Sequence, residues 1–259
     1  MKKKKKKNNI YIYMKIIETK NNIKIQGAKI NTAGRPEGLA PYLNYVNLSL
    51  IIGLPASGKS SLIKTLLNGT KEERLYNNVF HSIYYISPSA TIDLNLPEEK
   101  YIQLSDSMPL EEIMEDIIEN ESGLGEEDES HNVLIICDDC VNWLNGSKKS
   151  LTTFRKVCMN GRHILGKNSS LMCMLVSQKI KSVPLTLRSQ ANQVFFFDST
   201  KAEKAVFADE YLPLDIKEAN ILYKHIYDEP FNFLFVNLSL PIKKRIFKNF
   251  NSIEIIDED

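Results

Sequence analysis

The sequence predicts an α/β protein with a mainly parallel central sheet flanked by helices. Two observations lead to this fold class. Apolar strand-like segments alternate with helical segments along most of the chain, and several strand-like segments are apolar throughout, as strands covered on both faces are. With 259 residues, 43% hydrophobic and 25% charged, the chain is long enough for one large domain with a sizeable core or for two small ones.

The expected elements follow in order from residue 46. Strands are predicted where apolar runs occur, at 46–52, 81–87, 132–139, 170–178, 193–199 and 231–239. Helices are predicted where apolar residues recur on one face, at 59–68, within 105–120, at 147–159, near 201–209 and at 214–227. Two short alternating segments, 10–17 and 22–26, are expected to be strands that precede a loop rich in Gly and Pro at 31–42.

This pattern divides the chain into four parts. We expect a disordered Lys-rich tail at 1–9, short strands and a loop at 10–45, the main domain at 46–240 and a C-terminal extension at 241–259. The formal net charge is +1, but the six lysines of the tail leave the rest of the chain at −5. The folded part is therefore no general nucleic-acid binder, and DNA contacts would come from local basic clusters.

Composition also limits the compartment and the metal chemistry. No segment approaches the roughly 18 consecutive apolar residues of a membrane span. The N-terminal segment lacks the cleavage site of a signal peptide. Cys137 and Cys140 form a C-x-x-C pair, but no second pair follows, so a zinc site is incomplete. We expect the four cysteines to be buried, reduced thiols.

Residues 53–60, GLPASGKS, match the pattern G-x-x-x-x-G-K-[ST] between a predicted strand and a predicted helix. Such a P-loop turns its N–H groups toward nucleotide phosphates, and the N-terminus of the following helix favours negative charge. The lysine would neutralise the β- and γ-phosphates of ATP, and Ser60 would ligate Mg²⁺. The residues expected to bind nucleotide are Gly53, Leu54, Pro55, Ala56, Ser57, Gly58, Lys59, Ser60 and Ser61.

Two aspartates end the apolar run at 132–139. Asp138 is expected to hold Mg²⁺ through water, and Asp139 to act as the general base that polarises the attacking water. The alternative is an ordinary polar strand end.

Three further side chains are candidates for the reaction site. Gln178 ends another predicted strand, so in a parallel sheet it opens onto the same crevice and could orient the attacking water or sense the γ-phosphate. An ordinary surface glutamine is the alternative. Arg162 and Arg188 could each reach the γ-phosphate of a neighbouring subunit as an arginine finger, or form salt bridges or DNA contacts instead.

Together these pieces resemble the FtsK–HerA superfamily of DNA-pumping ATPases, in particular the poxvirus-type genome-packaging ATPases of large DNA viruses and virophages. The resemblance covers roughly 46–240 and rests on GLPASGKS, VLIICDD, NGRHILGKNSSLMCMLVSQ and VPLTLRSQANQVFFF. Many members have Asp-Glu at the second motif, whereas this chain has Asp138-Asp139. The shorter second carboxylate changes how the base reaches its water.

The resemblance implies a P-loop NTPase core of the ASCE type, with an extra strand between the two nucleotide motifs. It implies an Mg²⁺-dependent ATPase, usually a hexameric ring, that threads double-stranded DNA. It further implies a capsid or portal-like partner and a viral protein of the host cytoplasm or virus factory, or one associated with the virion. It makes Gln178 a γ-phosphate sensor and either Arg188 or Arg162 an arginine that acts in trans.

Other functions of a P-loop protein remain as alternatives. A small-molecule or nucleoside kinase would need an arginine-bearing lid and an acceptor pocket, and the sequence indicates neither. A GTP-operated switch usually carries an N-K-x-D motif, which is absent from the chain. A HerA-like helicase or translocase that is not tied to packaging is the main alternative within the motor class.

Overall fold

The computed structural model describes residues 14–19, 43–45, 47–68, 75–76, 79–89, 94–125, 130–161 and 163–257. The expected tail at 1–9, the strand at 22–26, the loop at 31–42 and Arg162 lie outside these residues. The helices are α1 Lys59–Asn68, α2 Leu110–Glu121, α3 Val141–Gly146, α4 Lys148–Asn160, α5 Leu185–Arg188, α6 Lys201–Tyr211 and α7 Ile216–Ile226. Short 3₁₀ turns occupy Glu98–Lys100, Ile180–Ser182 and Ile242–Lys244.

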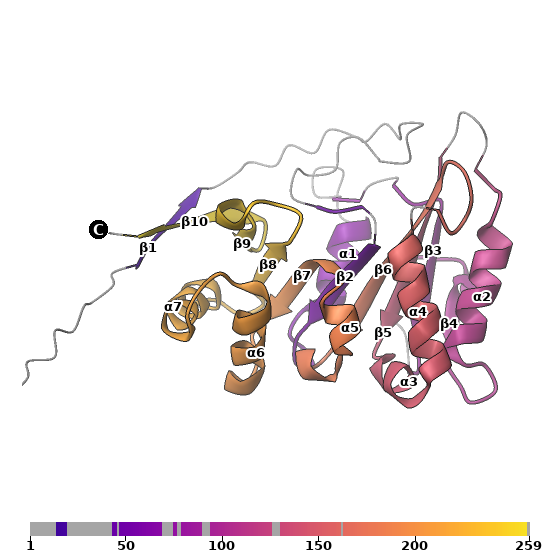
Figure 1. Ribbon diagram of the computed structural model, residues 1–259, viewed down its shortest axis with the longest axis horizontal. Coiled ribbons are helices and arrows are strands. Elements are labelled where there is room, and N and C mark those ends of the chain that lie inside the picture. The colour runs from indigo at the N-terminus through magenta and orange to yellow at the C-terminus, as the bar shows by residue number, and fades with distance from the viewer. Residues whose placement is uncertain are drawn as a thin grey trace, which may run out of the picture.

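A single ten-stranded sheet runs through the described part of the molecule, in the order β1-β10-β9-β8-β7-β2-β6-β5-β3-β4 (Figure 1). Its strands are β1 Met14–Thr19, β2 Asn47–Ile52, β3 Ser82–Ser87, β4 Tyr101–Gln103, β5 His131–Asp138, β6 Ser169–Ser177, β7 Ala191–Phe197, β8 Phe233–Asn237, β9 Ile246–Lys248 and β10 Asn251–Asp257.

Six neighbouring strands, β7-β2-β6-β5-β3-β4, are parallel, and the pairings from β7 through β8, β9 and β10 to β1 are antiparallel. Strand β6 lies between β2, which leads into the P-loop, and β5, which carries the two aspartates. The predicted α/β class and the predicted extra strand between the two nucleotide motifs are therefore confirmed.

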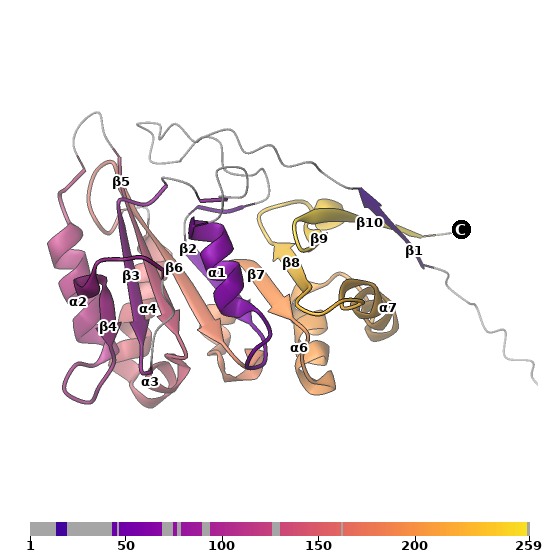
Figure 2. The same cartoon turned by 180° about the vertical axis from the view of Figure 1, so that it is seen from behind.

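Helices cover both faces of the sheet. Leu48, Leu50 and Ile52 of β2 face one hydrophobic cluster, which includes buried residues of α2, α4, α6 and α7. Ile51 faces a second cluster that includes the apolar side of α1. Seen from behind, α1 lies in front of β2, whereas α4 and α6 lie behind the sheet (Figure 2). This three-layer arrangement explains why the central strands are apolar throughout.

The C-terminal residues continue the same sheet. Within the C-terminal extension expected at 241–259, β9 pairs with β8 and β10 pairs with β9 in antiparallel register. Phe247 of β9 is fully buried, and its ring stacks on Phe235 of β8 with centroids 5.2 Å apart. Burial of these aromatic rings is what ties β9 to the domain.

Two further expectations concern burial and membranes. All four cysteines are buried, free thiols, as predicted. In the described ranges, no helix has both the length and the apolar character that crossing a bilayer requires.

Gly161 ends α4 at a point where the chain presses against β6. The Leu171 amide donates a 2.6 Å hydrogen bond to the Gly161 carbonyl. A Cβ added to Gly161 would lie 2.2 Å from the carbonyl oxygen of Leu171. Because that oxygen belongs to the backbone of a central strand, it cannot move aside cheaply. The Gly-Arg-His segment thus requires its glycine for close packing.

We predict that Gly161→Ala lowers the free energy of unfolding by about 3 kcal/mol, because overpacking against backbone costs at least as much as overpacking against side chains. Gly146→Ala is the matched control, since a Cβ there meets no atom within 4 Å. It should be neutral or stabilising by up to about 1 kcal/mol. Urea unfolding measures both variants, and equal effects would contradict this account of Gly161.

Candidate nucleotide site

The P-loop connects the end of β2 to the start of α1 at the carboxyl edge of the parallel strands. Gly53 is buried and its amide donates to the Ser177 carbonyl of β6 at 3.1 Å. A Cβ on Gly53 would lie 2.6 Å from both Phe197 Cβ and Ser57 Oγ. Only glycine therefore fits where the loop leaves the sheet.

Left-handed backbone at two residues curls the loop. Ala56 has a φ of 58° and Gly58 a φ of 106°. The Ser57 amide donates a hydrogen bond to the Leu54 carbonyl at 3.2 Å. Helix α1 begins after the loop, and the Leu62 amide donates to the Gly58 carbonyl at 2.9 Å. This curl and the free N–H groups of the first turn of α1 form the concave, electropositive surface that phosphates bind.

Lys59 bends back over its own loop. Its Nζ donates to the carbonyls of Gly53 at 2.6 Å and of Leu54 at 2.8 Å. Burial lowers the pKa of Lys59 from its usual range, and the charges of Asp139 and Asp138 oppose that shift. The ammonium thus lies close to both carboxylates. When a nucleotide binds, its phosphate oxygens can replace the two carbonyls as hydrogen-bond acceptors of Lys59.

The loop hydroxyls differ in their surroundings. Ser57 Oγ is buried and has no hydrogen-bond partner within the part of the chain that the structure describes. Ser60 and Ser61 are exposed on the first turn of α1. Leu54, Pro55 and Ala56 are also exposed. A buried hydroxyl without a partner costs free energy, and a ligand in the loop could relieve that cost.

Asp138 is the last residue of β5 and is half-buried. Tyr85 of β3 donates its hydroxyl to Asp138 Oδ2 at 2.5 Å. Burial raises the pKa of Asp138, and the charge of Asp139 raises it further, while the Tyr85 hydroxyl and Lys59 act in the opposite direction. The hydroxyl therefore fixes the orientation of the carboxylate and helps to keep it ionised.

Asp139 and Gln178 meet across neighbouring strands. Asp138 pairs with Val176 in the parallel register of β5 and β6, so the residues that follow each strand come together. The Asp139 amide donates to the Val176 carbonyl at 3.1 Å, and the backbone of Asp139 is left-handed, with a φ of 53°. Gln178 Nε2 then donates to Asp139 Oδ2 at 3.1 Å.

A cavity of ≈ 530 Å³ opens beside this carboxylate–amide pair. Asp139 and Gln178 line it together with Asn142, Trp143 and Lys179. Such a volume lies within the range of about 300–1,000 Å³ that small-molecule sites occupy. The cavity leaves room for a small ligand next to Asp139.

The oxygen donors at the end of β5 and the start of α1 fit Mg²⁺. The Ser60 hydroxyl and the Asp138 carboxylate are hard oxygen ligands of the kind that Mg²⁺ prefers. Among the described residues, no group of three or more His, Cys, Asp or Glu side chains could hold a metal ion. Ser60 and Asp138 would hold the ion, and Mg²⁺ bound there would neutralise charge on the phosphates of a nucleotide.

Arg188 lies apart from these residues. It ends α5, its guanidinium is paired with Glu210 of α6, and only 13% of its side chain is exposed. The Tyr211 hydroxyl donates to the Arg188 carbonyl at 3.0 Å. The cavity beside Asp139 is lined by other residues. The structure therefore brings together Lys59, Asp138, Asp139 and Gln178, but not Arg188.

Sequence reasoning missed Tyr85. It lies in an apolar strand next to Tyr84, and the two rings point to opposite faces of the sheet, so that only Tyr85 faces α1. The alternation within β3 indicates opposite faces, but the reach from Tyr85 to Asp138 depends on the pairing of β3 with β5. The sequence contains no signal of that pairing.

Comparisons with known proteins bear on the fold. No protein-family model matches the chain, and no curated protein sequence matches it. Among solved structures, it is similar to the genome packaging NTPase B204 from Sulfolobus turreted icosahedral virus 2 in complex with AMPPCP. The two share 14% identity with a TM-score of 0.52, over 82% of this chain and 98% of that one.

Two further structures agree with this likeness. The DNA-packaging ATPase B204 from Sulfolobus Turreted Icosahedral Virus has 15% identity and a TM-score of 0.51, over 82% of this chain and 98% of that one. The cytoplasmic domain of the Thermomonospora curvata Type VII secretion ATPase EccC has 14% identity and a TM-score of 0.52, over 87% of this chain and 25% of that one. The chain thus has the fold of these ATPases.

We predict that Tyr85→Phe weakens Mg²⁺ binding to the nucleotide complex roughly tenfold, as loss of an outer hydrogen bond to a metal-ligating carboxylate does. Without the hydroxyl, the pKa of Asp138 rises further, so protons compete better with the metal and the defect grows as the pH falls. Titration of Mg²⁺ into protein with ADP at several pH values measures this.

Tyr45→Phe is the matched control. It removes another buried hydroxyl, which shares a 2.8 Å hydrogen bond with Ser170 at the far end of the sheet. Tyr45→Phe should leave Mg²⁺ binding unchanged. An equal loss in both variants, or no loss in Tyr85→Phe, would contradict the assigned role of Tyr85.

Proposed function

We propose that the protein is an ATPase that translocates double-stranded DNA and packages a viral genome into its capsid. The observation that carries the catalytic part is the meeting of Lys59, Asp138, Asp139 and Gln178 at one edge of the sheet. A phosphate-binding loop, a metal carboxylate, a base and an amide are the parts that ATP hydrolysis requires.

The chemistry follows from these positions. Lys59 and the loop N–H groups would hold the β- and γ-phosphates of ATP, while Ser60 and Asp138 would hold Mg²⁺. When bound, Mg²⁺ neutralises charge on the phosphate oxygens. Asp139 would accept a proton from water as the water oxygen bonds the γ-phosphorus and the bond to the β–γ bridging oxygen breaks. Gln178, which contacts Asp139, would align that water and sense the γ-phosphate.

Hydrolysis is favoured over the kinase alternative by the Asp139–Gln178 pair. Gln178 Nε2 donates to Asp139 Oδ2 at 3.1 Å, which places a base next to an amide that can align a water molecule. A HerA-like helicase or translocase that is not tied to packaging would use the same site. The likeness to the packaging ATPase B204, over 98% of its length in both structures, supports packaging over that alternative.

The partners in this proposal are double-stranded DNA, a capsid or portal-like viral component and further copies of the chain in a hexameric ring. The protein would act in the host cytoplasm or virus factory, or in the virion. In the ring, Arg188 or Arg162 would reach the γ-phosphate of a neighbouring subunit. The Glu210 pair holds the guanidinium of Arg188 until a neighbour's phosphate replaces that carboxylate.

We expect Asp139→Asn to keep ATP binding and to lower turnover by about 10²- to 10⁴-fold, since the amide cannot accept the proton. Phosphate release and ATP affinity are the two measurements. Asp116→Asn, the same change at an exposed position of α2, is the matched control and should retain full turnover. Unchanged turnover in Asp139→Asn would remove it as the base.

A second pair of variants tests whether Arg188 acts as an arginine finger. Arg188→Ala should lower turnover by about 10³-fold or more, as loss of an arginine finger does. Glu210→Gln removes the partner but keeps the guanidinium and should remain active. If the ion pair were needed only for the fold, the two variants would lose activity equally.

Mixed assemblies separate action in trans from action within one subunit. Arg188→Ala and Asp139→Asn should each be inactive alone. If the arginine acts on a neighbour, mixing them creates interfaces with one intact base and one intact arginine, and turnover partly returns. No recovery in assemblies that mass measurement proves to be mixed would rule out Arg188 as the finger.

A further inference from the structure

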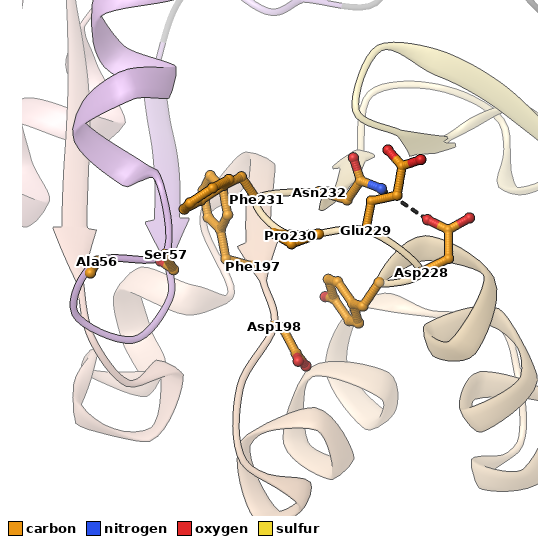
Figure 3. A pocket seen from close by; sticks show the side chains of 10 residues that line it. Ala56, Ser57, Phe197, Asp198, Asp228, Glu229, Pro230, Phe231 and Asn232 are labelled. Carbon is orange, nitrogen blue, oxygen red and sulfur yellow. Dashed lines mark hydrogen bonds between the residues drawn. The ribbon is translucent and has the colours of Figure 1, made fainter.

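A second cavity, of ≈ 360 Å³, adjoins the P-loop. Ala56 and Ser57 of the loop form one wall, and Phe197 at the end of β7 and the segment 227–232 between α7 and β8 form the rest. Figure 3 shows that Phe231 points from this segment toward the P-loop, near Phe197. None of the residues that line this cavity lines the one beside Asp139.

The two cavities lie on opposite sides of the P-loop. In the sheet, β6 and β5 lie on one side of β2, and β7 and β8 lie on the other. Asp139 and Gln178 follow β5 and β6, whereas the second cavity is built from the ends of β7 and β8. A nucleoside triphosphate carries its γ-phosphate at one end and its base at the other. With its γ-phosphate near Asp139, a triphosphate that follows the P-loop would carry its nucleoside toward the second cavity.

Phe231 has the position and exposure of a stacking platform. Phe231 is 69% exposed as a residue, although large apolar residues are usually buried. A Cβ on Gly58 would lie 3.5 Å from Phe231 Cδ1, so the ring lies beside the phosphate loop. The backbone of Phe231 is left-handed, with a φ of 66°, which is unfavourable for a bulky residue. An exposed aromatic ring and a strained backbone, both unfavourable for stability, thus occur at one residue next to the anion-binding loop.

The polar lining suits a nucleoside and not a second phosphate. Asp198, Asp228 and Glu229 line the cavity, and no Lys or Arg does so among the described residues. Asp228 accepts hydrogen bonds from Lys248 Nζ at 2.7 Å and Asn232 Nδ2 at 3.0 Å. The hydrogen bond from Lys248 lowers the pKa of Asp228, which keeps it an acceptor. Such acceptors pair with the amino and hydroxyl groups of a nucleoside.

We infer that the cavity between the P-loop and the α7–β8 segment binds the nucleobase of the nucleoside triphosphate, with a purine stacked on the exposed face of Phe231. This inference rests on the proposed binding of ATP and assigns its nucleoside end. A purine has the larger stacking surface, and its edge can donate to the acidic lining. Phe231 therefore contributes to binding of the base and the sugar, and not to binding of the phosphates.

Competition binding with two probes, ATP and inorganic tripolyphosphate, tests this inference. Phe231→Ala should weaken ATP binding by about tenfold or more, as loss of a base-stacking ring does, and leave tripolyphosphate affinity unchanged. Phe231→Trp, which keeps an aromatic face, should restore ATP affinity. Leu124→Ala is the control for loss of an exposed apolar side chain, because Leu124 is 54% exposed and lines neither cavity.

The outcomes separate the inference from the proposed function. Wild-type protein that binds neither probe overturns ATP binding itself. Wild-type protein that binds both, with ATP affinity unchanged in Phe231→Ala, overturns the base site alone. Equal losses of ATP and tripolyphosphate affinity also overturn it, since the ring would then support the P-loop. A smaller assembly mass with unchanged ATP affinity would assign Phe231 to a subunit contact instead.

Discussion

The parallel register of β2, β6 and β5 is the constraint on which the rest of the site depends. Ile52 pairs with Ser177, and Asp138 pairs with Val176, so the three strands end at the same level. The residues that follow these three strands therefore lie together at the carboxyl edge of the sheet. The P-loop, the paired aspartates and Gln178 are separated by many residues along the chain and meet only because β6 lies between the two motif strands.

Opposed charges make this edge suited to a phosphate that carries a metal. Burial disfavours the charged form of both Lys59 and Asp138, and each favours the charged form of the other. The Tyr85 hydroxyl adds a donor to the carboxylate. A bound polyphosphate would give the ammonium a new partner, and a cation would give the carboxylate one. Ligand binding would therefore relieve the cost of burying these groups.

The sequence predicts the parts of the site that lie next to a strong local pattern. Lys59 belongs to the G-x-x-x-x-G-K-[ST] motif after an apolar strand, Asp138 ends another apolar strand, and the contact of Gln178 with Asp139 follows from parallel pairing. Contacts between distant segments could not be predicted. Phe231 reaches the P-loop only because β8 pairs with β7, and its loop carries no motif. Likewise, Arg188 meets Glu210 through the packing of α5 against α6, and the short strand β9 depends on burial of its aromatic residue.

The proposed function joins a site for ATP hydrolysis to a ring that moves DNA, and one measurement tests that link most directly. ATP turnover by the full-length chain is measured with and without double-stranded DNA, while the mass of the assembly is determined in the same solution. The account predicts a ring, with a mass several times the 29.6 kDa of one chain, whose turnover rises when DNA is added. A monomer that hydrolyses ATP at a rate indifferent to DNA would contradict it.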